Sequence, residues 1–175
     1  IKELEALIDK FHGENVEYLK QIHSNKVYTY RKGSNDFKDN EGDALITNEK
    51  KVIIGVFTAD CVPVILVDKE NEAIAAIHSG WKGTFSSIVT ETILRMKEEY
   101  NSKAENIVAY IGPHIRQCCY EVSEDLKEQF LKKFDIEKDK LFNGRNLSLE
   151  ECINNDLINS GVLEENIHSL GLCTN

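Results

Sequence analysis

The sequence has no long apolar run and no excess of positive charge. None of its apolar segments reaches the ~18 residues that a membrane-spanning helix needs, and we expect no signal peptide. Its 21 Lys and Arg are outnumbered by 30 Asp and Glu, so the formal net charge is −9. A nucleic acid or an anionic membrane would require a basic field on the protein. We therefore expect neither as a partner, although a local basic patch for a small anion is compatible with this composition.

The sequence also shows no cysteine spacing typical of a disulfide framework and no composition shift typical of a domain boundary. The five cysteines are irregularly spaced and form no CxxC pair, so we expect reduced thiols and a cytoplasmic protein. No shift in composition divides residues 1–175, which predicts a single domain that is long enough to bury a sizeable core. The chain begins at Ile1 without a methionine and stops at "GLCTN", which is compatible with truncation at both ends.

The spacing of apolar residues predicts helices alternating with strands. Helical spacing predicts a surface helix over residues 1–12, a long helix over 84–100 with Thr84 as N-cap, and helices over 123–134 and 148–161. Strands are predicted over residues 16–23, 26–31, 51–57, 62–68, 72–78, 106–113 and 165–172, with a polar loop over 32–43. The near-continuous apolar strands favour coverage on both faces. The expected fold class is α/β (α+β type), with mixed β-sheet layers flanked by helices.

Three side chains with metal-binding chemistry stand at the ends of predicted strands. His23 closes "YLKQIH", Cys61 follows "TAD", and His78 closes "AAIH". Two imidazole nitrogens and a thiolate suit zinc better than magnesium or calcium, which prefer oxygen ligands. Three protein ligands leave a fourth tetrahedral position open, as in catalytic zinc sites. These residues therefore indicate a catalytic metal site.

Spacing alone leaves other interpretations open. A cysteine beside a strand is commonly a small buried apolar residue, and a histidine is commonly a satisfied core or surface residue. A metal-free alternative is a cysteine hydrolase, with Cys61 as nucleophile, a histidine as base and Asp60 as the group that orients it. A third is a structural zinc module for protein interactions, which would need a fourth protein ligand such as Cys118.

Six motifs in one order favour the metal site among these interpretations. They are "QIHSNKV", "GDALIT", "TADCVPVIL", "AAIHSGWKGT", "IGPHIRQCCYEV" and the closing "CT". Together they resemble the laccase-domain (YfiH-like) family, once labelled multicopper polyphenol oxidases and now described as purine nucleoside phosphorylases that also deaminate adenosine. The resemblance runs from His23 to Thr174, which is most of the chain.

The resemblance implies zinc held by His23, Cys61 and His78. It also implies phosphorolysis of adenosine, inosine, guanosine and methylthioadenosine, with adenosine deamination by a water whose pKa the metal lowers. Copper is the alternative metal, and a copper-dependent polyphenol oxidase is the alternative function. A multicopper centre needs many histidines, whereas this chain has five, at the scattered positions 12, 23, 78, 114 and 168. We therefore expect zinc.

Other residues near these motifs are candidates for substrate contacts. Lys82 lies between two glycines, before the helix expected to begin near Thr84, and is our candidate for phosphate together with the N–H groups of that helix. Asp60 is a candidate for orienting a histidine or relaying a proton, and equally for a turn. Asp43 is a candidate for the pocket, although an Asx-turn fits its context better.

Trp81 and Arg116 complete the set of candidates. Trp81 suits stacking on a purine, although a core position is favoured. Arg116, with His114, follows Gly112-Pro113 on a turn of the kind that often faces ligands. Structural roles are expected for three further cysteines and the last histidine: Cys118, Cys119, Cys152 and His168. Family members are typically longer, with a segment before the first helix and an Arg- and aromatic-rich stretch after "CT".

Overall fold

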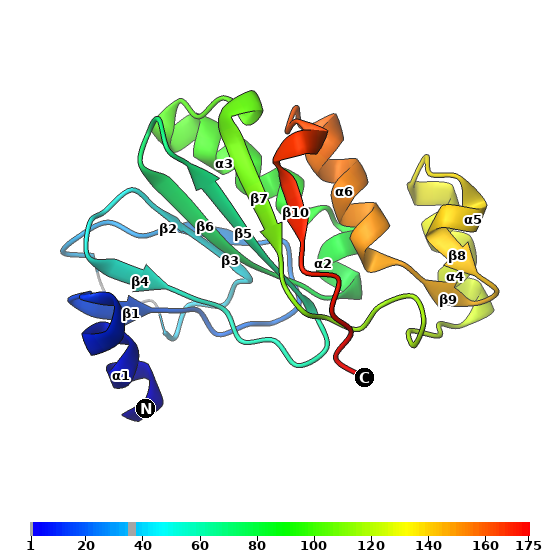
Figure 1. Ribbon diagram of the computed structural model, residues 1–175, viewed down its shortest axis with the longest axis horizontal. Coiled ribbons are helices and arrows are strands. Elements are labelled where there is room, and N and C mark those ends of the chain that lie inside the picture. The colour runs from blue at the N-terminus through cyan, green and yellow to red at the C-terminus, as the bar shows by residue number, and fades with distance from the viewer. Residues whose placement is uncertain (1, 35–37) are drawn as a thin grey trace.

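A computed structural model describes residues 2–34 and 38–175. Within these residues, six strands form one mixed sheet in the order β10-β7-β5-β6-β3-β2 (Figure 1). The two long strands at its centre, β5 (Val62–Asp68) and β6 (Ala73–Ser79), are antiparallel and joined by a tight turn. The expected α/β class with a mixed sheet is confirmed. The sheet matters for function because it decides which strand ends meet.

Shorter strands extend the sheet on both sides of this central pair. On one side, β7 (Ile107–Ile111) runs antiparallel to β5, and β10 (Ile167–Ser169) runs parallel to β7. On the other side, β3 (Ala44–Thr47) runs antiparallel to β6, and β2 (Val27–Thr29) runs parallel to β3. The segment of β3 was not predicted as a strand, because four residues beside a polar loop carry little periodicity.

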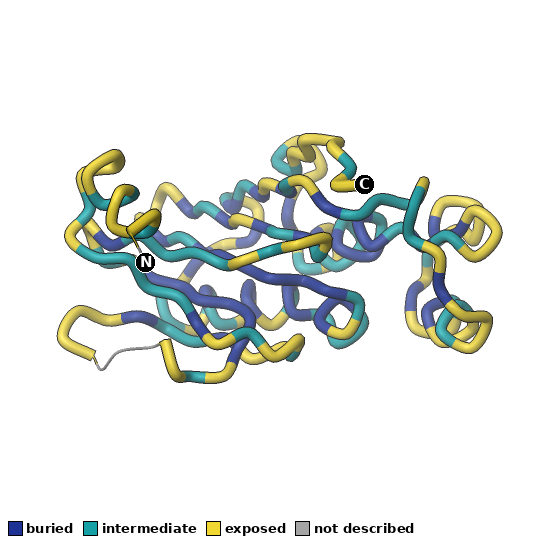
Figure 2. The backbone as a smooth tube through the Cα atoms, turned by 90° about the horizontal axis from the view of Figure 1, so that it is seen from below, coloured by how far each residue is buried: buried dark blue, intermediate teal, exposed yellow. Residues whose placement is uncertain are grey.

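Helices cover one face of the sheet. The long helix α3 (Ile88–Tyr100) and the helix α6 (Leu149–Asn159) lie against this face, with the short α2 (Trp81–Phe85) beside them (Figure 1). Ile93 and Met96 of α3 are fully buried, and burial of such side chains stabilises a fold by about 1.5–3 kcal/mol each. The buried residues concentrate in this layer, whereas the first helix and the connecting loops are exposed (Figure 2).

The opposite face is covered in part. A two-stranded ribbon of β1 (Asn15–Glu17) and β4 (Val52–Ile54) contributes to a second, smaller core that includes Leu45. Along β5 the buried and exposed positions alternate, and Ile65 of β5 and Tyr110 of β7 remain 51% and 47% exposed. The prediction that these strands are covered on both faces is therefore wrong for this part of the sheet.

The predicted helix over 84–100 is divided into two. α2 ends at Phe85, and Ser87 adopts a left-handed conformation, with φ 58°, before α3 begins. Ser86 Oγ donates a hydrogen bond to the carbonyl of Lys82, 2.8 Å away, and serine side chains that bond the backbone in this way compete with helix continuation. Thr84 is not the expected N-cap. It lies inside α2, and its N–H donates to the carbonyl of Gly80.

The first predicted strand is also shorter than expected. β1 ends at Glu17, so residues 18–23 are not strand. The N–H groups of the segment Ile22–Ser24 bond to a single carboxylate, that of Asp43, instead of to a neighbouring strand. Hydrogen bonds to Asp43, which is distant in the sequence, thus replace the strand pairing that the local sequence pattern predicts.

The remaining elements follow the predicted pattern more closely. Helices α1 (Lys2–Phe11) and α4 (Glu124–Lys133) match their predictions to within a few residues. Ser148 accepts a hydrogen bond from the N–H of Glu151 at the start of α6, as expected of a capping residue. The unpredicted elements are all short: α5 (Lys138–Leu141), the β8 (Phe142–Asn143) and β9 (Asn146–Leu147) pair, and the 3-10 turns Ala104–Asn106 and Glu164–Asn166. None of the helices in the described ranges has the length and apolar character needed to cross a membrane.

Candidate metal centre

The sheet brings Cys61 and His78 to one place. Because β5 and β6 are antiparallel, the start of β5 lies beside the end of β6, and Pro63 is paired with His78. Cys61 immediately precedes β5, whereas His78 is the second-last residue of β6. His23 reaches the same point from the loop between β1 and β2. Two side chains at opposite ends of successive strands thus become neighbours.

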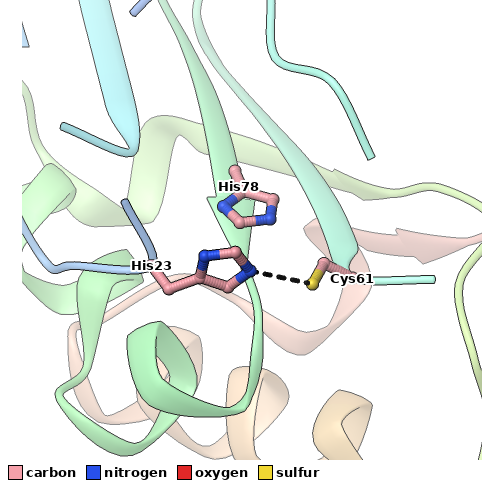
Figure 3. A group of neighbouring side chains, drawn as sticks. All are labelled: His23, Cys61 and His78. Carbon is pink, nitrogen blue, oxygen red and sulfur yellow. Dashed lines mark hydrogen bonds between the residues drawn. The ribbon is translucent and has the colours of Figure 1, made fainter. Parts of the chain in front are cut away.

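The three side chains converge with their donor atoms facing one another (Figure 3). Cys61 Sγ lies 4.0 Å from His23 Nε2, and one donor atom from each residue lies within 4.8 Å of the other two. The two imidazole rings are nearly perpendicular, with their centroids 4.9 Å apart. His78 is buried and His23 is exposed, so the cluster is rigid on its sheet side and accessible from solvent.

Asp43 holds two of these three residues in place. Its carboxylate is fully buried, and Oδ1 lies 2.8 Å from His78 Nδ1 and 3.0 Å from the backbone nitrogen of His23. Its Oδ2 accepts hydrogen bonds from the N–H and the hydroxyl of Ser24, at 2.7 and 2.6 Å. The N–H groups bound to this carboxylate form an anion-binding nest, in which His23 has a left-handed backbone with φ 58°. Asp43 therefore contacts the cluster directly, whereas the sequence analysis favoured an Asx-turn for this residue.

The same contacts set the protonation of the pair. Burial raises the pKa of Asp43, but the hydrogen bonds from His78 and Ser24 outweigh burial and lower the pKa to about 2. Burial lowers the pKa of His78, but the bond to Asp43 and the adjacent Cys61 thiol outweigh burial and raise the pKa to about 9. Because Nδ1 donates to Asp43, Nε2 is the nitrogen left to face His23 and Cys61.

Gly80 provides the space that the cluster occupies. A Cβ atom at this position would lie 3.0 Å from Cys61 Sγ and 3.1 Å from His23 Cδ2. The backbone of Gly80 has an ordinary φ of −74°, so the glycine is required by close approach and not by conformation. The "HSGW" motif thus combines a ligand candidate with the gap beside it.

The donor set fits a single zinc ion. With Zn–N of about 2.05 Å and Zn–S of about 2.3 Å, tetrahedral coordination separates nitrogen from sulfur by about 3.5 Å. The 4.0 Å between Cys61 Sγ and His23 Nε2 is close to this value. Two imidazoles and a thiolate leave one position open, which is typical of catalytic sites. Cys118, the fourth ligand proposed for a structural site, lies in a separate group of thiols.

Asp60 has a different environment from the one expected of a histidine-orienting group. Its Oδ1 accepts a hydrogen bond from Thr174 Oγ1, 2.7 Å away, and its carbonyl accepts from the N–H of Ile115. Asp43, not Asp60, bonds the ring of His78. Asp60 therefore connects the loop that carries Cys61 to the C-terminal segment. Its carboxylate accepts a hydrogen bond from Thr174 and does not orient a histidine.

Trp81 and Lys82 follow the cluster in α2. Trp81 is half-buried and packs against the main core, in line with the core position favoured from sequence. Lys82 is exposed, and its Nζ lies 5.6 Å from the centroid of the Trp81 ring. Thr84 N–H, expected to be free for phosphate, instead donates to Gly80. The anion site predicted at that helix start therefore lacks one of its donors.

Arg116 lines a polar cavity of about 270 Å³ with His114 and Glu150. Its guanidinium bonds Glu150 Oε2 at 3.2 Å and the carbonyl of Gly171 at 3.0 Å. Glu150 is buried in the first turn of α6 and lies 4.0 Å from His114 Nε2. Sequence reasoning missed Glu150, because a carboxylate in a helix first turn is explained by the helix dipole alone. In this arrangement Arg116 is paired and is not a free cation.

Comparison with known families and proteins gives a consistent result. Residues 2–175 match the family model described as "Multi-copper polyphenol oxidoreductase laccase". A protein of Clostridium acetobutylicum named purine nucleoside phosphorylase is 44% identical over 169 residues, which cover 97% of this chain and 70% of that protein. One of the same name from Aquifex aeolicus is 42% identical over 134 residues, covering 76% of this chain and 62% of its own length. This chain thus spans less than two thirds of some of the relatives that it matches.

Solved structures share the fold. The YfiH protein of Bacillus licheniformis superimposes with a TM-score of 0.88 at 23% identity, covering 99% of this chain and 70% of that one. YlmD of Geobacillus stearothermophilus gives a TM-score of 0.86 at 23% identity, covering 97% of this chain and 68% of that one. At this level of identity the likeness establishes the mixed α/β architecture, and it says nothing further about chemistry.

Proposed function

This chain belongs to the family of multi-copper polyphenol oxidoreductase laccases, and we propose that it is a zinc-dependent purine nucleoside phosphorylase. The observation that carries the proposal is the His23, Cys61 and His78 cluster, ordered by Asp43 and open on one side. The proposal is supported by relatives that bear this name and match nearly the whole chain. The proposed substrates are purine nucleosides and phosphate, and a cytoplasmic location suits the free thiols.

The reaction requires an anion near a carbon that becomes cation-like. A phosphate oxygen forms a bond to C1′ of the ribose, the C1′–N9 bond breaks, and its electron pair leaves with the purine, which takes up a proton. Lys82 remains our candidate for holding phosphate, because it is exposed, whereas Arg116 is held by Glu150. Trp81 precedes Lys82 in the chain, and the Lys82 ammonium lies over its ring. The ring therefore positions the lysine side chain.

Zinc held by His23, Cys61 and His78 would supply a Lewis acid that lowers the pKa of a bound water. Asp43 keeps the proton of His78 on Nδ1 and so keeps Nε2 available as a ligand. The partial exposure of Cys61 and the exposure of His23 leave the cluster accessible from solvent. We propose adenosine deamination as a second activity at the open coordination position of the metal. In this reaction water replaces the C6 amino group and ammonia leaves.

Copper chemistry of the laccase type has weaker support than zinc. Among residues 2–34 and 38–175, one group combines histidine with cysteine as candidate ligands. A multicopper oxidase needs several copper centres, most of them with histidine ligands. The donor set alone admits copper as well as zinc, so the metal has to be measured.

Metal analysis and a nucleoside screen test the proposal together. The purified chain should contain at least one equivalent of zinc. With phosphate it should convert inosine, guanosine, adenosine and methylthioadenosine to the free base and a sugar 1-phosphate. Chelation should abolish turnover and zinc should restore it. Formation of inosine and ammonia from adenosine without phosphate would support the second activity.

Other outcomes would identify the alternatives. Release of base without phosphate would make the protein a hydrolase. Activity that survives exhaustive chelation but is lost on alkylation of Cys61 would indicate the metal-free cysteine hydrolase. Bound zinc with no turnover of any nucleoside would favour the structural module, and oxidation of phenols with bound copper would favour the laccase.

A further inference from the structure

A second group of potential ligands lies outside the His23, Cys61 and His78 cluster. Cys118 Sγ lies 3.3 Å from Cys119 Sγ and 3.6 Å from Cys173 Sγ, and all three sulfurs lie within 4.8 Å of one another. Cys118 and Cys119 belong to the turn after β7, whereas Cys173 lies 55 residues away from Cys118 in the C-terminal segment. All three are free thiols.

Backbone contacts hold the two parts of this group together. His114 and Cys173 are paired in a parallel bridge, with the N–H of Thr174 donating to the carbonyl of His114 at 3.1 Å. The N–H of Arg116 donates to Cys173 Sγ at 3.4 Å. The turn closes on itself, because the N–H of Cys119 donates to the carbonyl of Arg116. The sulfurs are thus brought together by fixed backbone and not by chance overlap of long side chains.

The exposure of these thiols argues against the structural role that the sequence analysis expected for Cys118 and Cys119. Cys118 is exposed, and Cys119 and Cys173 are partly exposed. Cys152 is different, because it is fully buried in the main core, where a thiol serves as a small apolar residue. Packing explains Cys152, but it does not explain three accessible sulfurs that meet at one point.

We propose that Cys118, Cys119 and Cys173 form a second metal site, which takes a soft d¹⁰ cation, Zn²⁺ or Cu⁺. Three sulfurs at about 2.3 Å from one zinc ion in tetrahedral geometry lie about 3.8 Å apart. The 3.3 and 3.6 Å separations are close to this value. Thiolates select these ions over Mg²⁺ and Ca²⁺. Three ligands also suit Cu⁺, whereas Zn²⁺ would complete its shell with a water.

The site is joined to the first cluster through the chain. Cys173 is followed by Thr174, whose hydroxyl bonds the carboxylate of Asp60, and Asp60 precedes Cys61. A metal held by the three thiols would therefore fix the C-terminal segment against the loop that carries a ligand of the first cluster. This second site does not depend on the proposed phosphorylase activity.

The decisive measurement removes the first cluster and then counts metal. In a full-length His23→Ala/Cys61→Ser background, the chain should still bind one equivalent of zinc, or of Cu⁺ under anaerobic reducing conditions, by native mass spectrometry. Adding Cys118→Ser or Cys173→Ser should abolish this binding at equal metal. Adding Cys152→Ala, at the buried thiol, should leave it intact. X-ray absorption on the background protein should show a shell of sulfur ligands without imidazole.

A second measurement needs no substitution at the three thiols. In a His23→Ala chain, which retains Cys61, bound zinc or Cu⁺ should protect Cys118, Cys119 and Cys173 from alkylation, but not Cys61. No metal bound by the background protein, or binding that persists in Cys173→Ser, would overturn the proposal. A disulfide between Cys118 and Cys173 that persists under reductant would also overturn it.

Discussion

Asp43 Oδ1 lies 2.8 Å from His78 Nδ1, and the same oxygen accepts the N–H of His23. One buried carboxylate therefore orients the ring of one ligand candidate and the backbone of another. The strand register explains the contact. Ala44 of β3 is paired with Ile77 of β6, which places Asp43 beside His78. A carboxylate that orients a histidine ligand in this way raises metal affinity and selects the nitrogen that binds.

Replacing Asp43 should weaken metal binding more than replacing Asp60. In Asp43→Asn the negative partner of His78 is lost, and loss of a group that orients a metal ligand typically lowers metal affinity about 10–100-fold. Asp60→Asn is the matched control, because Asp60 bonds Thr174 and no histidine. Zinc affinity should be measured for both by competition with a chromophoric chelator. Equal losses in the two variants would contradict the role given to Asp43.

His23→Ala should remove the metal bound by the His23, Cys61 and His78 cluster while the chain remains folded. His12→Ala is a close control, because His12 is also exposed and also has a left-handed backbone, with φ 54° against 58° for His23. Both variants should therefore change stability by a similar, small amount. Metal analysis after dialysis, on chains that also carry Cys118→Ser to remove the second proposed site, should show zinc in the His12 variant and not in the His23 variant. Retention of zinc by that His23 variant would exclude His23 as a ligand.

Gly80→Ala should damage the cluster without unfolding the protein. The added methyl group would lie 3.0 Å from Cys61 Sγ and 3.1 Å from His23 Cδ2, so both must move. We expect zinc affinity to fall at least about tenfold, which corresponds to ~1.4 kcal/mol. Gly55→Ala is the control, because nothing lies within 4 Å of its added Cβ. Unchanged zinc affinity in Gly80→Ala would show that the gap beside the cluster is not needed.

Lys82→Ala should raise the KM for phosphate and leave bound zinc unchanged. The reason is that a phosphate dianion near C1′ needs a cation to offset its charge, and Lys82 is the exposed cation four residues after His78. Lys103→Ala, also at an exposed position, is the control. Initial rates at varied phosphate concentration give the comparison. If phosphate dependence is the same in all three proteins, the anion contact lies elsewhere, for example at Arg116.

Asp68→Asn should lower stability at neutral pH and much less in acid. Burial raises the pKa of Asp68, but the Ser102 hydroxyl and the hydrogen bonds from Asn71 and Glu70 in the β5–β6 turn outweigh burial and lower the pKa. A lowered pKa in the folded state means that the stabilisation is present above the unfolded pKa of about 3.9 and is lost as pH falls through the folded value.

Urea unfolding at pH 7 and at pH 3 tests this. The variant should be less stable by about 1–2 kcal/mol at pH 7, and the difference should shrink at the lower pH. Asp39→Asn, at an exposed position, should change stability at neither pH. A difference between Asp68→Asn and the parent that is the same at both values would show that the carboxylate charge does not stabilise the turn.

Local pattern was sufficient for the long elements and failed where distant groups compete. β5 begins and ends where it was predicted, because five of its seven residues are Val, Ile or Leu and its last residue, Asp68, accepts the hydrogen bonds of the turn. Residues 18–23 were predicted as strand, but their N–H groups include donors that bond Asp43. The residues near His23 do not predict its hydrogen bond to Asp43, because the two residues are 20 positions apart in the chain. The break at Ser86-Ser87 was missed because the apolar spacing continues across it.

The sequence by itself determined the chemistry that the protein can carry. His23, Cys61 and His78 are the residues with the right donor atoms, and their motifs identify the family. Only the tertiary structure decided which other groups contact and orient these side chains. Asp43 reaches His78 because β3 pairs with β6, and Cys173 reaches Cys118 because the C-terminal segment pairs with the turn after β7. The donor atoms of a residue follow from its type, whereas the contact that orients a ligand depends on strand register, which is set by long-range burial of the sheet.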